Sequence, residues 1–445
     1  MTGRILSLIE KKKGQDGNTY YYLRDYTQNP NSAFQDQESG FYCYVEDELK
    51  ELIKQNRIIV DNLKLTSSGQ LRRTPTKPAV DEYYLMHGDT KVATVKKNGE
   101  CRIHRPGLMP YALYLEEPKA EDIDTRIQNL DNFNHFLATR VLTMDRQYAK
   151  EIMNSLQFTQ METDRDRAQI ALSYHALSLK DLYWIRRPYE NVDFASINLY
   201  ENSLGEAFVD VTLRGKQLSV QNSHLIADDL ATDGVFPKAW IRREDGFHLL
   251  KDGGPETVSR ELAASRIARC FDVRQVLYES AEYDGQPVSD SRIMTSMEFS
   301  IASMEEFSIY AANHDFDPID FVKKLDKQGY YMMNIIDYLV GNTDRHWGNW
   351  GVLVDNRNNK PVRLYDLMDF NQSFQNYDTP DGAGCMTVHR TGERCTQREA
   401  AEEAVRQIGL NQIREIPMEC IEDPQTREMF IRRLDILKSV DKTRE

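Results

Sequence analysis

Two polar residues at a fixed spacing, Asp344 and Asn349, carry the clearest chemical signal in this sequence. They lie in the segment Gly341–Asn349, and an Asp followed five residues later by an Asn is the spacing of a protein-kinase catalytic loop. The chemistry needs both types, because the carboxylate accepts the proton of an attacking hydroxyl group and the amide oxygen holds a magnesium ion on phosphates. The segment therefore predicts phosphoryl transfer. The alternative is that Asp344 only caps a turn.

A second acidic residue follows the loop at the end of a predicted β-hairpin. Apolar runs at residues 350–354 and 362–365 flank a polar turn, which is the pattern of a hairpin. The segment Asp369–Asn371 comes next and is similar to the Asp-Phe-Gly element whose Asp binds magnesium in kinases. We predict Asp369 as the second metal ligand, with Asp366 as its rival. Oxygen ligands of this kind favour a hard cation, Mg²⁺ or Mn²⁺.

A kinase also needs a lysine for the nucleotide phosphates, on a strand that precedes the catalytic loop. Residues 240–243 and 247–251 read as a hairpin that ends in Lys251. The following segment, residues 257–270, keeps the apolar spacing of a helix and carries Glu261. We predict Lys251 as the ATP-binding lysine and Glu261 as its ion-pair partner, although Glu256 lies nearby.

Helices are expected to hold these residues in place. Residues 332–340 form a mostly apolar helical run that Gly341 ends, so a buried helix leads directly into the polar loop. Residues 397–408 and 426–437 repeat apolar positions at the spacing of helices that pack on a core. The region after residue 298 is therefore predicted to be mainly helical around the catalytic hairpin.

Together, the segment Gly234–Lys238, the strand ending at Lys251, the loop Asn342–Asn349 and the segment Arg363–Asp369 resemble the HipA family of bacterial toxin kinases. Residues 234–238 read Gly-Val-Phe-Pro-Lys, which is similar to the Gly-Val-Gln-Pro-Lys-like phosphate loop of that family. The match covers roughly the C-terminal half with its order intact. It implies an α+β, two-lobed protein-kinase-like fold, preceded here by small α+β N-terminal modules.

The resemblance also implies roles for single residues. Asp344 would be the catalytic base, Asn349 and Asp369 would hold magnesium, and Lys251 would contact ATP. In the family a loop serine can be autophosphorylated, and this chain has Thr232 in the corresponding stretch, which makes Thr232 the candidate autophosphorylation site. The candidate ATP-binding residues, including two at the expected boundary between the lobes, are Gly234, Val235, Lys238, Lys251, Glu261, Met297 and Glu298.

Four regions are expected along the chain. They are a small α+β module at residues 1–75, a second α+β region at 76–177, a kinase small lobe with the ATP-binding strand at 178–297, and a mainly helical large lobe at 298–445. Within them, short β-like runs are predicted at residues 19–24, 40–45, 83–114 and 192–218, and helices at 46–56 and over most of 122–177.

Composition narrows the class of protein. The chain has 445 residues, enough for several domains, and a net charge of −14, which disfavours a large nonspecific nucleic-acid surface. No apolar run approaches the length of a membrane span and no signal peptide is apparent, so we expect a cytoplasmic protein without membrane contact. The six cysteines are scattered without a Cys-x-x-Cys pair, which predicts free thiols.

The leading hypothesis is a HipA-like serine/threonine protein kinase that uses ATP and Mg²⁺ or Mn²⁺. The resemblance implies a bacterial toxin–antitoxin or phage-defence setting and a DNA-binding antitoxin as partner. A second reading is a phosphotransferase for a small molecule or lipid, since a fold does not fix the acceptor. A third is a regulatory protein that binds nucleotide without catalysis.

Overall fold

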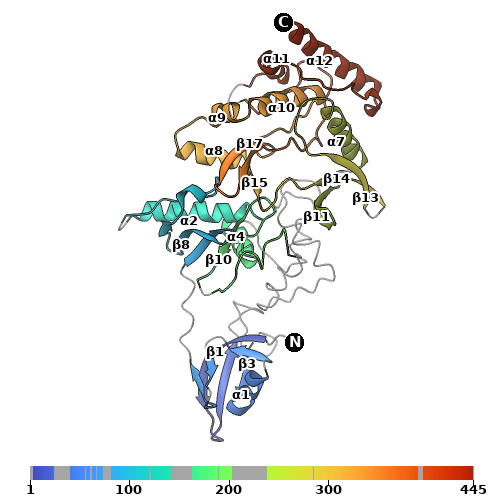
Figure 1. Ribbon diagram of the computed structural model, residues 1–445. Helices are drawn as coiled ribbons and strands as arrows, with labels where there is room; N and C mark the ends of the chain where they lie inside the picture. The colour runs from blue at the N-terminus through green and yellow to red at the C-terminus, as the bar shows by residue number, and fades with distance from the viewer. Residues whose placement is uncertain are drawn as a thin grey trace.

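The protein is a mixed α+β chain whose helices gather toward its C terminus (Figure 1). It is described by a computed structural model. The structure describes residues 4–24, 41–55, 57–60, 63–66, 68–73, 82–119, 122–141, 163–188, 190–202, 238–283, 285–388 and 394–443. The predicted phosphate loop with Gly234 and Val235, and the candidate Thr232, lie outside these residues.

The N-terminal module is a four-stranded sheet with one helix packed on it. Its strands run in the order β3-β2-β1-β4, and a separate pair, β5 and β6, follows. Leu49 of the helix packs on buried strand residues such as Leu23, so the module has a hydrophobic core of its own. The elements are β1 Arg4–Lys13, β2 Thr19–Arg24, β3 Phe41–Val45, α1 Glu46–Lys54, β4 Ile58–Val60, β5 Leu63–Leu65 and β6 Leu71–Arg73.

The middle region is a second four-stranded sheet, in the order β10-β7-β8-β9, against which two helices pack. β10 lies beyond the boundary expected at residue 178, yet it pairs antiparallel with β7 of the preceding region. The elements are β7 Glu82–His87, β8 Thr90–Lys96, β9 Cys101–Ile103, the 3-10 turn Pro106–Leu108, α2 Ile123–Ala138, α4 Asp164–Ser173 and β10 Tyr183–Arg186.

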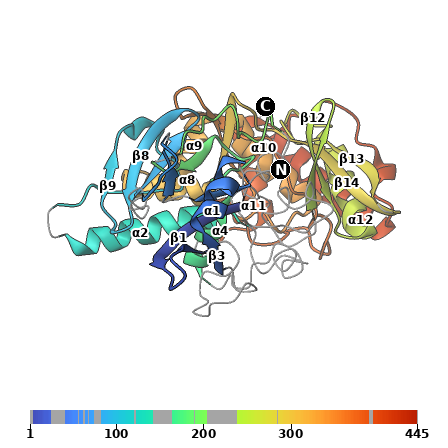
Figure 2. The same ribbon diagram turned by 90° about the horizontal axis from the view of Figure 1, so that it is seen from below.

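A third sheet carries the predicted lysine. Its order is β11-β12-β14-β13, with α7 packed against β13 and β14. Seen from below, this sheet and the β7–β10 sheet lie on opposite sides of the molecule under the helical lobe (Figure 2). Phe247 of β12 enters the core of the middle region, which joins the two sheets. The elements are β11 Lys238–Arg243, β12 Gly246–Lys251, α7 Pro255–Ala268, β13 Tyr278–Tyr283 and β14 Gln286–Arg292.

The C-terminal lobe packs helices around a three-stranded sheet, β15-β16-β17, and buries the largest hydrophobic core. α10 runs through this core and ends at Gly341, whose φ of 62° is the left-handed conformation that glycine adopts most easily. The elements are β15 Phe299–Ser303, α8 Met304–Asn313, α9 Pro318–Leu325, α10 Lys327–Val340, β16 Gly351–Asp355, β17 Lys360–Leu364, α11 Gln397–Ile408, the 3-10 turn Met418–Cys420 and α12 Pro424–Lys442.

Most predicted elements occur close to their expected bounds, but the strands expected over residues 192–218 do not form where the structure describes them. Residues 192–202 form turns, and the rest lies outside the described residues. The reason is local: the buried Asn198 side chain donates to the carbonyl groups of Phe194 and Ala195 at 3.2 Å each. These bonds favour a turn over a strand.

Candidate active site

Lys251 lies at the end of β12, and its side chain is only 9% exposed. Its Nζ donates to Oε1 of Glu261 at 3.0 Å and to Oδ1 of Asp369 at 2.9 Å. Burial alone would lower the pKa of Lys251, but the charges of Asp369 and Glu261 outweigh it and raise the pKa well above its ordinary value. The lysine is therefore held as a cation between two carboxylates.

Glu261 reaches this centre from α7, on the side of the helix that faces the sheet. The residue is 2% exposed, and its second oxygen, Oε2, accepts a hydrogen bond from Ser289 Oγ of β14 at 2.5 Å. A buried carboxylate needs such partners, since an unpaired one is costly. Glu256, the rival on the same helix, is exposed in the first turn. The structure thus pairs Lys251 with Glu261.

Asp369 has an unusual backbone, because its φ of 62° is rare for a residue other than glycine. Its N–H group donates to Tyr278 Oη at 3.0 Å, and its carbonyl oxygen accepts from Asn342 Nδ2 at 3.1 Å. Burial would raise the pKa of this carboxyl, but Lys251 and Lys238 lower it to about 2. Asp369 is therefore fixed in place as an anion.

Asp344 stands in the loop after α10, and its side chain is 42% exposed. Burial raises the pKa of this carboxyl above its ordinary value, opposed by His346 and supported by the charge of Asp369. Nδ2 of Asn349 donates to the Asp344 carbonyl oxygen at 2.9 Å. Because the side-chain nitrogen of Asn349 forms a hydrogen bond within the loop, its side-chain oxygen is the atom that remains for a ligand.

The sequence did not identify two residues that hold the loop in place, Arg345 and Asn342. Arg345 is buried, and its guanidinium group donates to both oxygens of Asp337 in α10, at 2.9 and 3.0 Å. The same group donates to the carbonyl oxygens of Asn349, at 2.9 Å, and Met368. Arg345 thereby ties α10, the loop and the Asp369 segment together. The signal for it was Asp337, an acid within an otherwise apolar helix.

Asn342 makes a second bridge of this kind. Its Nδ2 donates to the Asp369 carbonyl oxygen, and its Oδ1 accepts from the Asp344 N–H group at 3.2 Å. One side chain therefore connects the backbones of the two acidic residues. The sequence lacked a signal for this role, since Asn342 lies 27 residues before Asp369.

The rival acid and the remaining candidates lie as follows. Asp366 is 28% exposed and pairs with Arg363 at 2.7 Å. Lys238 lies on β11 directly opposite Lys251 and is half-buried. Met297 and Glu298 precede β15, and their carbonyl oxygens accept from the side-chain and backbone nitrogens of Asn356, respectively, at 3.2 and 2.9 Å. Lys238 is thus close to Lys251, while the carbonyl oxygens of Met297 and Glu298 accept hydrogen bonds from Asn356.

The oxygen donors fit a magnesium ion only in part. Within the described ranges, no group of three or more His, Cys, Asp or Glu side chains is arranged to hold a metal. Asp369 and Asn349 offer a carboxylate and an amide oxygen, and Mg²⁺ usually takes one or two carboxylates and completes its shell with water and substrate phosphates. This donor set matches a metal that arrives with a nucleotide.

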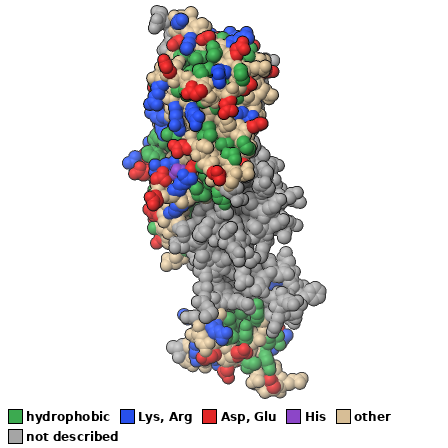
Figure 3. Space-filling model, turned by 90° about the vertical axis from the view of Figure 1, so that its right-hand side faces the viewer, with side chains coloured by type: hydrophobic (Ala, Val, Ile, Leu, Met, Phe, Trp, Pro, Cys, Tyr) green, Lys and Arg blue, Asp and Glu red, His purple; other side chains and the backbone are tan. Residues whose placement is uncertain are grey.

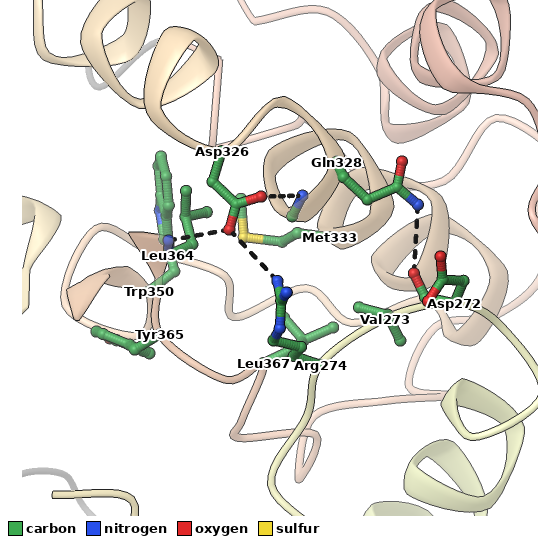
Figure 4. Close-up of a pocket in the computed structure, with 11 residues that line it drawn as sticks. Asp272, Val273, Arg274, Asp326, Gln328, Met333, Trp350, Leu364, Tyr365 and Leu367 are labelled. Atoms are coloured by element: carbon green, nitrogen blue, oxygen red, sulfur yellow. Dashed lines mark hydrogen bonds and ion pairs between the residues drawn. The ribbon is translucent and has the colours of Figure 1, made fainter. Parts of the chain in front are cut away.

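A cavity of about 280 Å³ lies between the start of α10, β17 and residues 272–274 (Figure 4). Asp326, the residue that caps α10, accepts from the N–H groups of Gly329 at 2.9 Å and Leu364 at 3.1 Å. Leu367 lines the cavity, and its N–H group donates to the carbonyl oxygen of Arg274 at 3.0 Å. The cavity therefore borders the segment that leads to Asp369 but contains none of the predicted catalytic residues.

Fold and site together define a kinase-like protein. A strand lysine is paired with a helix glutamate, and a polar loop after a buried helix faces an aspartate that follows a hairpin, which is the arrangement of protein kinases. The predicted α+β, two-lobed kinase-like fold is thus confirmed. Among the described residues, no helix is long and apolar enough to cross a membrane.

Comparisons with known proteins found solved structures that are similar to this chain. It is similar to the proinflammatory kinase CtkA of Helicobacter pylori, with a TM-score of 0.36 and 14% identity over 46% of this chain and 92% of that one. It is also similar to HipA of Shewanella oneidensis MR-1, solved with HipB and operator DNA, with a TM-score of 0.43 and 11% identity over 81% of this chain and 99% of that one. No protein-family model and no curated protein matches the sequence.

Proposed function

We propose that this chain is an ATP-dependent serine/threonine protein kinase. The observation that carries the proposal is the double ion pair of Lys251, with Glu261 at 3.0 Å and Asp369 at 2.9 Å, beside the loop that bears Asp344. A buried lysine held between a helix glutamate and a metal-binding aspartate is arranged to receive phosphates.

Each residue then has a defined task. Lys251 binds nucleotide phosphate oxygens, and Glu261 orients it. Asp344 accepts the proton of the attacking Ser or Thr hydroxyl group; its half-exposed carboxylate is open to an acceptor, and its raised pKa makes it a better base than an ordinary aspartate. Arg345 and Asn342 position the loop and touch no reacting atom.

The metal would be held by Asp369 and the Asn349 amide oxygen, with Asp366 kept apart by its pair with Arg363. A bound Mg²⁺ or Mn²⁺ supplies positive charge that stabilises the phosphoryl group during transfer. Because Lys251 and Lys238 hold the pKa of Asp369 at about 2, this ligand is ionised at every pH at which the protein would work.

The test is mass spectrometry of the purified protein after incubation with Mg-ATP, alone and with a bacterial lysate. We expect phosphate on Ser or Thr of the protein itself or of a lysate protein. Asp344→Asn should lower the rate about 100-fold to 10,000-fold, the usual contribution of a general base, and should leave ATP binding intact. Asp435→Asn, the same substitution at an exposed position of α12, is the matched control.

Other outcomes point to other functions. ATP hydrolysis that depends on Asp344 and leaves no phosphate on protein would favour a small-molecule or lipid acceptor. ATP binding with neither transfer nor hydrolysis would favour a regulatory nucleotide-binding protein. Full activity of Asp344→Asn would remove Asp344 as the base.

The biological setting, a toxin–antitoxin or phage-defence system with a DNA-binding partner, is proposed from the family resemblance of the sequence. On the face drawn in Figure 3, basic and acidic side chains are interspersed over the described part of the C-terminal lobe, at the top of the view. Co-purification of the tagged chain with the products of neighbouring genes, followed by DNA binding of the complex and of the chain alone, would test this partner.

A further inference from the structure

Two cysteines, Cys385 and Cys395, lie opposite each other next to the catalytic loop. Gly384 and Thr396 form an antiparallel β-bridge. Cys385, which follows Gly384, therefore lies opposite Cys395, which precedes Thr396. The Cys385 N–H group donates to the Cys395 carbonyl oxygen at 2.8 Å. Directly paired residues of antiparallel strands have Cα atoms about 4.5–5.5 Å apart, which is within the range of about 4.4–6.8 Å that a disulfide spans.

The two thiols differ in access. Cys385 is buried, and its Sγ lies 3.1 Å from Thr387 Oγ1 and 3.5 Å from Asn334 Oδ1 of α10. Cys395 is partly exposed. Burial raises the pKa of the Cys395 thiol, and the neighbouring Cys385 raises it further. The pair therefore consists of an accessible thiol and a shielded one in direct reach of each other.

The pair is also placed where a cross-link would reinforce the site. One residue beyond Cys385, the Met386 carbonyl oxygen accepts from Trp347 Nε1 of the loop at 2.9 Å. Two residues beyond Cys395, Gln397 Nε2 donates to the Asn342 carbonyl oxygen at 2.6 Å. The two segments that carry these contacts lie opposite each other at the cysteines.

We propose that Cys385 and Cys395 form a reversible disulfide by exchange with a low-molecular-weight disulfide such as glutathione disulfide. The Cys395 thiolate attacks the reagent, forms a mixed disulfide and releases one glutathione. The Cys385 thiolate then attacks Sγ of Cys395 and releases the second. Two protein thiols are oxidised to one disulfide, one reagent disulfide is reduced to two thiols, and no other reactant is needed.

The test uses the full chain, glutathione disulfide, alkylation of the remaining thiols and tryptic mapping, and does not depend on kinase activity. We expect peptides 364–390 and 395–398 to appear as a linked pair, lighter by two hydrogen atoms than the sum of the reduced peptides. Linkage should be faster at pH 9 than at pH 7, since both thiols have a raised pKa. It should also raise the melting temperature, because it restrains the unfolded chain.

Single variants separate the two steps. Cys385→Ser lacks the second thiol, so glutathione should remain on Cys395 as a mixed disulfide, whereas Cys395→Ser should leave Cys385 reduced. Cys43 is exposed and reports ordinary glutathione addition. Glutathione retained on wild-type Cys395 as it is on Cys43, with Cys385 still open to alkylation, would overturn the proposal.

Discussion

The N-terminal module and the Lys251 centre each contain a lysine–glutamate pair of almost the same length, but the first pair is partly exposed and the second is buried. Lys50 and Glu46 are one helical turn apart on α1, 2.9 Å from each other and 22% and 29% exposed. Lys251 and Glu261 are 3.0 Å apart but only 9% and 2% exposed, and they join a strand to a helix. The distance between the charged atoms therefore does not distinguish a pair within one surface helix from a pair in a candidate active site. The two pairs differ in their burial and in the number of secondary-structure elements that they join.

The comparison predicts that the two lysines differ greatly in what their removal costs. Lys251→Met leaves the buried Glu261 and the partly buried Asp369 without their cation, and breaking a buried pair in this way costs about 3–5 kcal/mol. ATP binding should be lost as well. Lys50→Met should leave the urea unfolding curve unchanged, because a partly exposed pair within one helix contributes little. Urea denaturation and ATP titration of both variants check this.

A second change sharpens that prediction. In Lys251→Met with Glu261→Gln, one of the two stranded carboxylates is gone, so part of the lost stability should return. Equal stability of the single and double variants would mean that Lys251 does not neutralise Glu261 in solution.

The next largest effect separates the two acids that follow the hairpin. Asp369→Asn should weaken Mg-ATP binding about 10-fold to 100-fold or more, a loss seen even when outer residues of a metal site are changed. Asp366→Asn removes only its partly exposed pair with Arg363 and should change the affinity far less. Isothermal titration with Mg-ATP, and with ATP in the presence of a chelator, compares them. The reverse order would move the metal ligand to Asp366.

The sequence was sufficient for features that depend on neighbours in the chain. The hairpin ending at Lys251, the helix carrying Glu261 and the end of α10 at Gly341 follow from periodicity and turn residues, and the structure contains all three. Such signals act over a few residues, so a single sequence displays them.

The supports of the site were missed because their partners are distant in sequence. Asn342 bonds to the backbone of Asp369, and Arg345 to that of Met368, contacts that no local pattern encodes. The pairing of β10 with β7 is of the same kind, since it brings together strands almost a hundred residues apart. Topology decides these contacts, and one sequence without its fold does not.

Separate hydrophobic cores give a third way to test the comparison. Leu49 of α1 and Leu339 of α10 are both fully buried, in the N-terminal core and the C-terminal core respectively. Either Leu→Ala change should cost about 2–5 kcal/mol in the core that it disturbs. Only Leu339→Ala should also lower phosphoryl transfer, because α10 leads into the proposed catalytic loop. Activity assays beside urea denaturation would show whether the cores act independently.

The smallest effect concerns Asp344 itself and reverses the usual sign of a substitution. Its pKa is raised in the folded protein, first by burial, so the folded state binds the proton more tightly than the unfolded chain. The stability that this carboxyl contributes is present at low pH and is lost as the pH rises from its ordinary value, about 3.9, through the raised one. At neutral pH the ionised Asp344 is therefore a net cost to the fold.

Asp344→Asn removes that cost, so we expect its urea midpoint at pH 7 to lie slightly above that of the wild type, with the difference shrinking as the pH approaches about 4. The gain is small because the side chain is 42% exposed. The pH dependence of the activity should report the pKa of the same carboxyl. Because His346 lowers the pKa of Asp344, His346→Gln should shift the acid limb of the pH–rate profile to higher pH. A variant that is inactive yet more stable marks a residue kept for catalysis. For the partly exposed pair Lys50–Glu46 of the N-terminal module, we expect no such gain of stability at the expense of activity.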